Sequence, residues 1–232
     1  MLDVVLFVAA PYAVVLLFCL SAIYRSRLGT FTHSSLFSQL PENRDHFWAI
    51  APFHVGIIIV VAGHLLAFLV PRQILLWNAR PLRLYMLETA ALGAALLALV
   101  GIVMALLRPG TNGAVRMVTT RTDWLVGLLL CFQVSTGIYL AVFCSWGSSW
   151  FAASMAPYLW SLVKLQPDVS FLAPMPLIVQ GHVASAWALV ALFPFSRLVQ
   201  FLFVPYSYYW HRPQVARWNK APGRAQREAP RP

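Results

Sequence analysis

The sequence contains very little charge. Only 10% of its 232 residues are charged, whereas 60% are hydrophobic, and a soluble globular domain carries about 25% charged residues. This shortage excludes a soluble domain with a fully solvated surface. We also expect no separate soluble domain, because too little polar sequence remains to form one.

Cysteine is also scarce, and the three that occur are Cys19, Cys131 and Cys144. None of them forms a CxxC pair, a zinc-ligand spacing or the CxxCH motif that attaches haem covalently. Iron–sulfur clusters are held by several cysteine thiolates. The chain therefore has no cysteine pattern for an iron–sulfur cluster, a zinc site or a covalent haem.

The hydrophobic residues form five long runs. A helix that crosses a bilayer needs about 20 mostly apolar residues, so we predict an all-α integral membrane protein with a bundle of five transmembrane helices. The first run lacks a basic segment before it and is expected to be a retained helix rather than a signal peptide. The segment from Gly147 to Pro176 is too polar to span and is expected to be interfacial and partly helical. The predicted spans are Val4–Tyr24, Phe47–Val70, Leu82–Leu107, Trp124–Trp146 and Leu177–Val204.

The 17 Lys and Arg residues, which give a net charge of +10, are distributed unevenly. Twelve lie in the first and third loops and the tail, four lie in the second and fourth loops, and Arg197 lies in the fifth span. Because cytoplasmic loops are rich in Lys and Arg, we predict that the amino terminus is outside and the carboxyl terminus is cytoplasmic. Residues 1–210 then form the transmembrane domain, and residues 211–232 form a basic, Pro-rich cytoplasmic tail. The distribution argues against nucleic acid as a partner.

Three of the six histidines lie inside the apolar spans. They are His54 and His64 in the second span and His182 in the fifth, each with a glycine within two residues. A glycine there would let a bulky planar group lie close to the helix backbone. An imidazole in hydrocarbon is costly unless it is satisfied, and neutral imidazole is a common ligand of haem iron. For one such histidine, a hydrogen bond to a backbone carbonyl is the better explanation, but three together favour haem binding.

Three short stretches form a more specific pattern: FHVGI at 53–57 followed by Gly63-His64, VRMVTT at 115–120, and PFSRLV at 194–199. In these stretches, and in the order of its spans, the chain resembles the gamma subunit of respiratory nitrate reductase. That family consists of membrane-embedded dihaem cytochromes b. The resemblance extends along nearly the whole chain and implies a transmembrane cytochrome b domain over residues 1–210.

The resemblance implies two haem b groups. The outer, distal haem would be bound by His64 and His182, and the inner, proximal haem by His54 and a histidine that follows the PFSRLV run. Gln200 stands at that last position in this sequence. Three interpretations stay open: weak ligation by the Gln200 amide, a five-coordinate iron on His54, or loss of the proximal haem. We favour a retained but altered proximal haem, because His54 would otherwise be an unsatisfied imidazole.

Charged side chains in or beside the spans are further candidates. Arg197 lies near the inner haem level, where a guanidinium can pair with haem propionates, although snorkelling to the headgroups explains it equally well. The family's quinol pocket lies beside the distal haem and uses a basic residue near the outer end of the third span, for which Arg80 and Arg83 are the candidates. Glu88 lies well inside that span and either relays protons from quinol or pairs with a neighbouring polar group.

The function implied by the resemblance is that of a haem b-containing subunit of a nitrate reductase-like complex, multi-pass in the cell (inner) membrane. It would oxidise quinol near the outer face and pass electrons to an iron–sulfur subunit, which is joined by a molybdenum catalytic subunit on the cytoplasmic face. Membrane lipid is the other expected partner. The alternatives are the equivalent subunit of a nitrite oxidoreductase or of a sulfur- or heterodisulfide-linked complex, and a haem-free membrane anchor.

Overall fold

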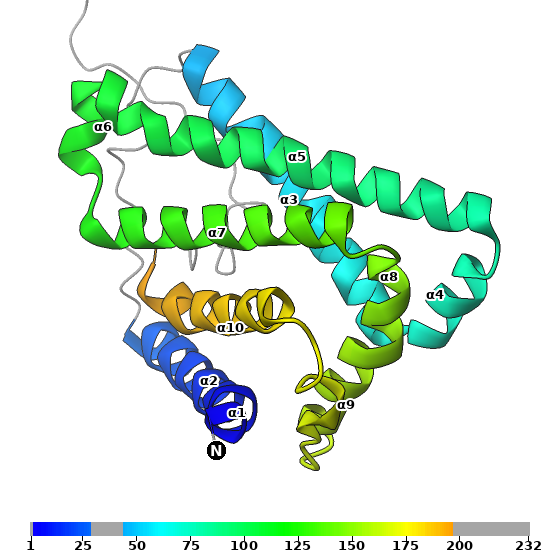
Figure 1. Ribbon diagram of the computed structural model, residues 1–232. Coiled ribbons are helices and arrows are strands. Elements are labelled where there is room, and N and C mark those ends of the chain that lie inside the picture. The colour runs from blue at the N-terminus through cyan, green and yellow to red at the C-terminus, as the bar shows by residue number, and fades with distance from the viewer. Residues whose placement is uncertain (1, 29–43, 197–232) are drawn as a thin grey trace, which may run out of the picture. The chain divides into compact units, whose positions relative to one another are not determined.

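The computed structural model describes residues 2–28 and 44–196, and every regular element within these ranges is a helix (Figure 1). The longer helices are α2 (Ala10–Leu28), α3 (Arg44–Leu69), α5 (Pro81–Thr111), α7 (Arg121–Phe143) and α10 (Leu177–Leu192). The shorter elements are α1 (Leu2–Val4), η1 (Val5–Ala9), α4 (Pro71–Asn78), α6 (Gly113–Val118), α8 (Gly147–Trp150), η2 (Phe151–Met155), α9 (Ala156–Val163), η3 (Val169–Phe171) and η4 (Phe193–Phe195).

Five helical stretches within the described residues are long and apolar enough to cross a membrane. They overlap the five predicted runs, so the prediction of an all-α, multi-pass membrane protein is confirmed. The predicted fifth span continues to Val204, and its residues beyond Ser196 lie outside the described part of the chain, as does the tail at 211–232. The five stretches are Val5–Tyr24, Ala51–Leu69, Pro81–Thr111, Arg121–Phe143 and Leu177–Phe195.

The spans pack on one another in a definite order (Figure 1). Helix α3 packs against α5, α5 against α7, α7 against α10, and α10 against α2. The last span therefore lies against the first one as well as against α7. As a result, His182 on α10 faces neighbours from helices that are distant in sequence.

Small side chains allow α3 and α5 to approach closely. Gly56 of α3 lies against the backbone of Ala94 and Ala98, and Gly101 of α5 lies against the backbone of Phe53. A Cβ atom at Gly56 would lie 2.5 Å from the Ala98 nitrogen, and one at Gly101 would lie 2.8 Å from the Phe53 Cα. Small residues at helix contacts in membranes permit such close packing, which replaces the hydrophobic driving force available in water.

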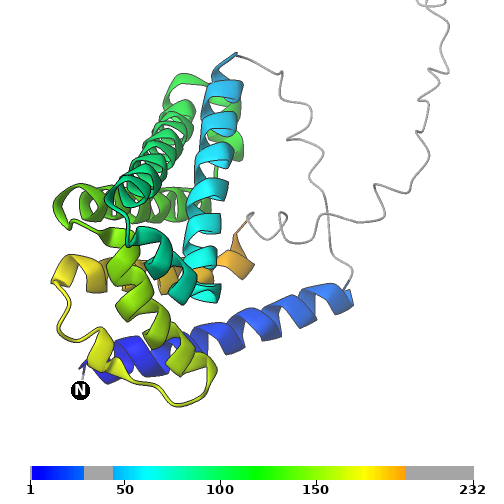
Figure 2. The ribbon, with the colours of Figure 1, turned by 90° about the vertical axis from the view of Figure 1, so that its right-hand side faces the viewer.

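The segment between α7 and α10 is folded into α8, η2, α9 and η3 instead of a further span. Its apolar side chains pack on η1, α2 and α10. Figure 2 shows this yellow-green segment lying beside the blue helix formed by η1 and α2. Tyr158 Oη donates a hydrogen bond to the Phe7 carbonyl at 2.7 Å, and Tyr12 Oη donates to the Leu162 carbonyl at 3.0 Å. Burial raises the pKa of Tyr158 to about 12, so the phenol keeps the proton that it donates. The prediction of a partly helical segment is confirmed.

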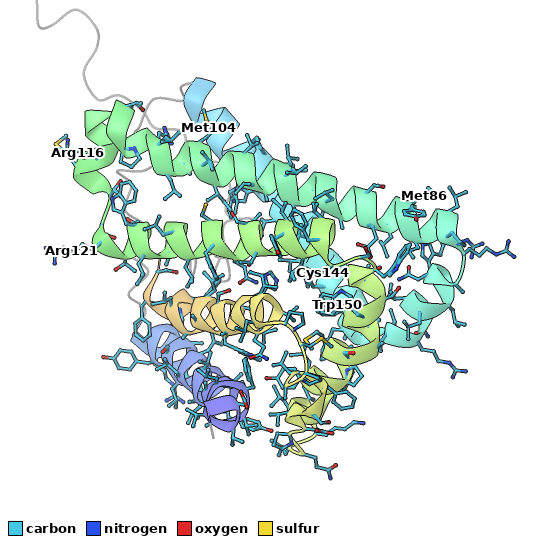
Figure 3. The ribbon with its side chains drawn as sticks, viewed as in Figure 1. Met86, Met104, Arg116, Arg121, Cys144 and Trp150 are labelled. Carbon is cyan, nitrogen blue, oxygen red and sulfur yellow. The ribbon has the colours of Figure 1, made fainter. Side chains whose placement is uncertain are left out.

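The two ends of α7 carry different side chains. Figure 3 shows Arg116 and Arg121 near its first residue and Trp150 beyond its last one. A capping box determines where the helix begins: the Thr120 hydroxyl accepts from the Asp123 N–H at 3.3 Å, and the Asp123 carboxylate accepts from the Thr120 N–H at 2.9 Å. The two arginines thus lie at the end of α7 that the sequence predicts to be cytoplasmic.

Candidate functional site

His182 lies at the centre of a polar cluster between α10 and α7. Its Nε2 atom is 3.0 Å from Gln133 Nε2, and its Nδ1 atom is 2.9 Å from Thr136 Oγ1. Ser185, one turn further along α10, donates its hydroxyl hydrogen to Gln133 Oε1. Thr136 and Ser185 are buried. We refer to Gln133, Thr136, His182 and Ser185 as the His182 cluster.

The hydrogen bonds of the cluster define where its protons lie. Thr136 Oγ1 is 2.9 Å from the Phe132 carbonyl oxygen and 3.0 Å from that of Gln133, and carbonyl oxygens can only accept. The Thr136 hydroxyl therefore donates its proton to the backbone and accepts a hydrogen bond from His182 Nδ1–H. The Nε2 atom of the neutral ring then carries a lone pair, which accepts from the Gln133 amide. A histidine that binds a metal needs such a lone pair.

His64 has the same tautomer in a different setting. Its Nδ1 atom is 2.8 Å from the carbonyl oxygen of Val60, one turn earlier in α3, so Nδ1 donates and Nε2 carries the lone pair. The ring is exposed on the described helices, and it packs edge-on against Phe151 with 5.2 Å between ring centroids. Phe151 and Val183, the residue after His182, pack against the same hydrophobic core. The structure therefore brings the two predicted distal ligands into one region.

The donors in this region suit a haem iron. Among residues 2–28 and 44–196, no group of three or more His, Cys, Asp or Glu side chains could hold a metal ion. A zinc site built from protein alone needs three or four ligands, whereas haem iron is held by its own ring and takes only axial ligands from the protein. Two imidazoles with lone pairs on Nε2 meet that requirement. The Gln133 amide is hydrogen-bonded to Nε2 of His182 and would have to move away for that atom to bind iron.

The predicted proximal site is described only in part. His54 is exposed on α3, and its ring packs edge-on against Phe53 with 5.3 Å between centroids. Gly56, two residues later, packs against α5, so its missing side chain serves the crossing of the two helices and not the haem contact that the sequence had suggested for it. The other two predicted residues of this site, Arg197 and Gln200, lie outside the described residues.

Glu88 forms part of a polar network near the amino-terminal end of α5. Its Oε1 atom accepts from the backbone N–H of Ser148 at 2.8 Å and from the Ser148 hydroxyl at 2.7 Å. Asn78 Nδ2 in turn donates to the hydroxyl oxygens of Ser148 and Ser149 at 2.9 and 3.0 Å. The network joins α4, α5 and α8. Of the two roles considered for Glu88, pairing with a neighbouring polar group is therefore the one observed.

The two arginines considered for a quinol pocket lie at the start of α5. Arg80 is the N-cap residue of the helix and is exposed. The guanidinium of Arg83 lies over the indole of Trp77 at 5.0 Å from its centroid, and the Arg83 carbonyl accepts from Trp77 Nε1 at 3.3 Å. A cation over an indole face is stabilised by the ring quadrupole. Arg83 is thus positioned by an aromatic neighbour near the Glu88 network.

The sequence reasoning did not identify Gln133, Thr136 or Ser185. A signal was present, because Gln133 and Thr136 lie three residues apart in a mostly apolar span and so share one helix face. Polar side chains inside a span need partners, but the spacing does not say which partner. Here it is His182, at sequence separations of 49 and 46, and only the packing of α7 on α10 identifies it.

The chain is similar to known proteins along most of its length. A family model described as "Nitrate reductase gamma subunit" matches residues 3–219. The nitrate reductase gamma chain of Bacillus subtilis is 28% identical over 204 residues, covering 85% of this chain and 90% of that protein. The respiratory nitrate reductase 1 gamma chain of Escherichia coli is 27% identical over 221 residues, covering 93% and 97%. The nitrate reductase-like protein NarX of Mycobacterium tuberculosis is 28% identical over 227 residues, which cover 93% of this chain and 35% of that longer protein.

Proposed function

The chain belongs to the nitrate reductase gamma subunit family, and on this premise we propose that it is the haem b-containing, quinol-oxidising membrane subunit of a respiratory nitrate reductase. The family membership makes it a membrane subunit of an oxidoreductase complex. One observation supports the haem: His64 and His182, on separate spans, lie in one region and each carries a lone pair on Nε2.

Quinol, on this proposal, binds near the outer face of the cell inner membrane and gives up two electrons and two protons. The protons are released outside, and the electrons pass to an iron–sulfur subunit and then to a molybdenum catalytic subunit, both on the cytoplasmic face. The uneven distribution of Lys and Arg supports this orientation. Arg116 and Arg121 contribute to the basic surface at the proposed cytoplasmic end. A reporter protein that functions only in the cytoplasm should accordingly be active when it is fused after residue 232.

The proposed roles of the histidines come from the resemblance to the family, and the hydrogen bonds of His64 and His182 are compatible with them. His64 and His182 would hold the distal haem b through their Nε2 atoms, and His54 would hold the proximal one. A bound haem b supplies one-electron transfer, which no protein side chain in an apolar span performs as readily. The Val60 carbonyl and the Thr136 hydroxyl keep the protons of the two distal ligands on Nδ1, so both Nε2 atoms stay unprotonated.

We predict that the native complex, purified through a tag on this chain, contains b-type haem that quinol reduces. The haem-to-protein ratio would be measured as the pyridine haemochromogen. Anaerobic addition of menadiol should then produce the absorption of reduced b-type haem, and nitrate should reverse it. A complex without haem would contradict the proposal and favour the membrane anchor. Haem that menadiol fails to reduce would contradict the quinol-oxidising role.

We also propose that the proximal haem is retained, with His54 on one side of its iron and Gln200 as a weak ligand or no ligand on the other. Gln200 follows His182 by 18 residues, but α10 ends at Leu192 and the backbone of Ser196 is extended, so helix periodicity does not carry this proposal. It rests on Gln200 standing where the family pattern has the second histidine ligand. An amide is a weaker donor than imidazole, so the unmodified protein should show a high-spin ferric signal in electron paramagnetic resonance. The Gln200→His variant should convert that signal to a low-spin bis-histidine one. A ratio of one haem per chain, with only a low-spin signal in the unmodified protein, would show that the proximal haem is absent.

A further inference from the structure

The ring of His182 lies edge-on against α7. Gln133 contacts Nε2 and Thr136 contacts Nδ1, at 3.0 and 2.9 Å. The carbon between those nitrogens, Cε1, faces Gly137, where a Cβ atom would lie only 3.3 Å away. One face of α7 therefore contacts all three atoms along this edge of the imidazole.

The two polar contacts differ in what a bound iron would do to them. Nε2 is the atom proposed to bind iron, so the Gln133 contact has to be given up when the site is loaded. Nδ1 lies on the other side of Cε1 and does not bind the metal, so the Thr136 contact can persist. Thr136 has a relative exposure of 6%, and its hydroxyl is tied to the Phe132 carbonyl at 2.9 Å. Its oxygen is therefore already oriented to accept from the ring.

We propose that Thr136 is a positioning residue for the distal haem, acting through His182. By accepting the Nδ1–H hydrogen bond it fixes the orientation of the ring and increases the electron-donating strength of Nε2. A more basic ligand stabilises ferric over ferrous iron, because ferric iron carries more positive charge. Thr136 thereby lowers the midpoint potential of the distal haem. This inference rests on the proposed function, since it needs a haem on His182.

The other proposed ligand of that haem is positioned by different means. His64 Nδ1 bonds to the carbonyl of Val60 in its own helix, at 2.8 Å. A main-chain carbonyl is present whatever residue occupies position 60. His182, in contrast, depends on a side chain of another helix. Thr136 is therefore the point at which a substitution can change the electronic properties of the pair without removing a ligand.

Three variants of the native complex test the inference by redox titration of the haem spectrum. Thr136→Val keeps the volume of the side chain and removes the acceptor, Thr136→Ser keeps a hydroxyl, and Ser135→Ala removes a hydroxyl from the exposed side of the same helix. Thr136→Val should keep the normal haem-to-protein ratio. At a fixed ambient potential its ferric-to-ferrous ratio at the distal haem should fall on the order of tenfold, which equals about 59 mV for one electron. The Thr136→Ser and Ser135→Ala variants should both titrate like the unmodified protein.

The outcomes separate this inference from the function on which it rests. An unchanged potential in Thr136→Val, with full haem content, would overturn the role of Thr136 and leave the haem assignment intact. If Thr136→Val loses haem and Thr136→Ser retains it, the hydroxyl is needed to position His182, as proposed. If both lose it, the hydroxyl is not what matters, and the inference is wrong. Retention of the distal haem in His182→Ala would instead overturn the proposed ligand.

Discussion

Replacing His64 or His182 with alanine removes one b-type haem per chain, and replacing both removes no more than either change alone. The reason is that the two imidazoles are proposed to be the axial ligands of a single iron, so losing one of them removes a bond that the apolar surroundings cannot replace. The described structure supports the pairing, because both rings lie in one region, near Phe151, with a lone pair on Nε2.

The measurement is the haem-to-protein ratio of the purified complex, together with its reduced-minus-oxidised spectrum. His33→Ala is the matched control, since His33 lies outside the predicted spans and should leave the ratio unchanged. His54→Ala should remove a different haem, so combining it with His64→Ala should remove both. If the His64→Ala and His182→Ala losses were additive, the two histidines would bind different haems and the pairing would be wrong.

Replacing Gly101 with leucine should separate α3 from α5 and destabilise the whole membrane domain by about 3 kcal/mol or more. Even a Cβ atom at this position would lie 2.7 Å from the Cβ and 2.8 Å from the Cα of Phe53. The neighbour is largely backbone, which cannot rotate aside as a flexible side chain would. Gly56→Leu should act in the same way from the opposite helix, because Gly56 lies against the backbone of Ala94 and Ala98.

Gly93→Leu is the matched control for this change. Gly93 lies in the same helix as Gly101, is exposed, and has no neighbouring atom within 4 Å of the position that a Cβ atom would take. Leucine is also the better helix former, by about 0.8 kcal/mol, so this variant should be as stable as the unmodified protein or slightly more stable. Thermal unfolding in detergent, followed by circular dichroism, measures the difference. Equal unfolding temperatures for Gly101→Leu and Gly93→Leu would show that the close crossing is not needed for stability.

The loss of stability at Gly101 should extend to the haem. Helix α3 carries both His54 and His64, and Phe53, which contacts Gly101, is the residue before His54. A displaced α3 would therefore move both histidines together. Gly101→Leu should consequently lose both haems at a lower temperature than the unmodified protein, whereas His64→Ala should lack only the distal haem, and should lack it at every temperature.

The sequence by itself determined the number of spans and their approximate positions. The cost of placing charge or an unsatisfied backbone in hydrocarbon is a local property, so a run of apolar residues identifies a span without knowledge of its neighbours. The same locality applies to Glu88, His54, His64 and His182, because a polar side chain inside an apolar run requires a partner wherever the helix lies. These residues were recognisable before any fold was known.

Only the tertiary structure decided what the partners are. Thr136 and Gln133 approach His182 across 46 and 49 positions of sequence, and Ser148 reaches Glu88 across 60. Such contacts depend on which helices pack together and how each is rotated, and the nearly uniform apolar surface of a membrane helix encodes little of this. Gly56 shows the limit most clearly. Its place beside His54 suggested space for a haem, but the crossing of α3 and α5 uses that space for the backbone of Ala94 and Ala98. A glycine specifies only that something comes close, and the packing of the helices determines what it is.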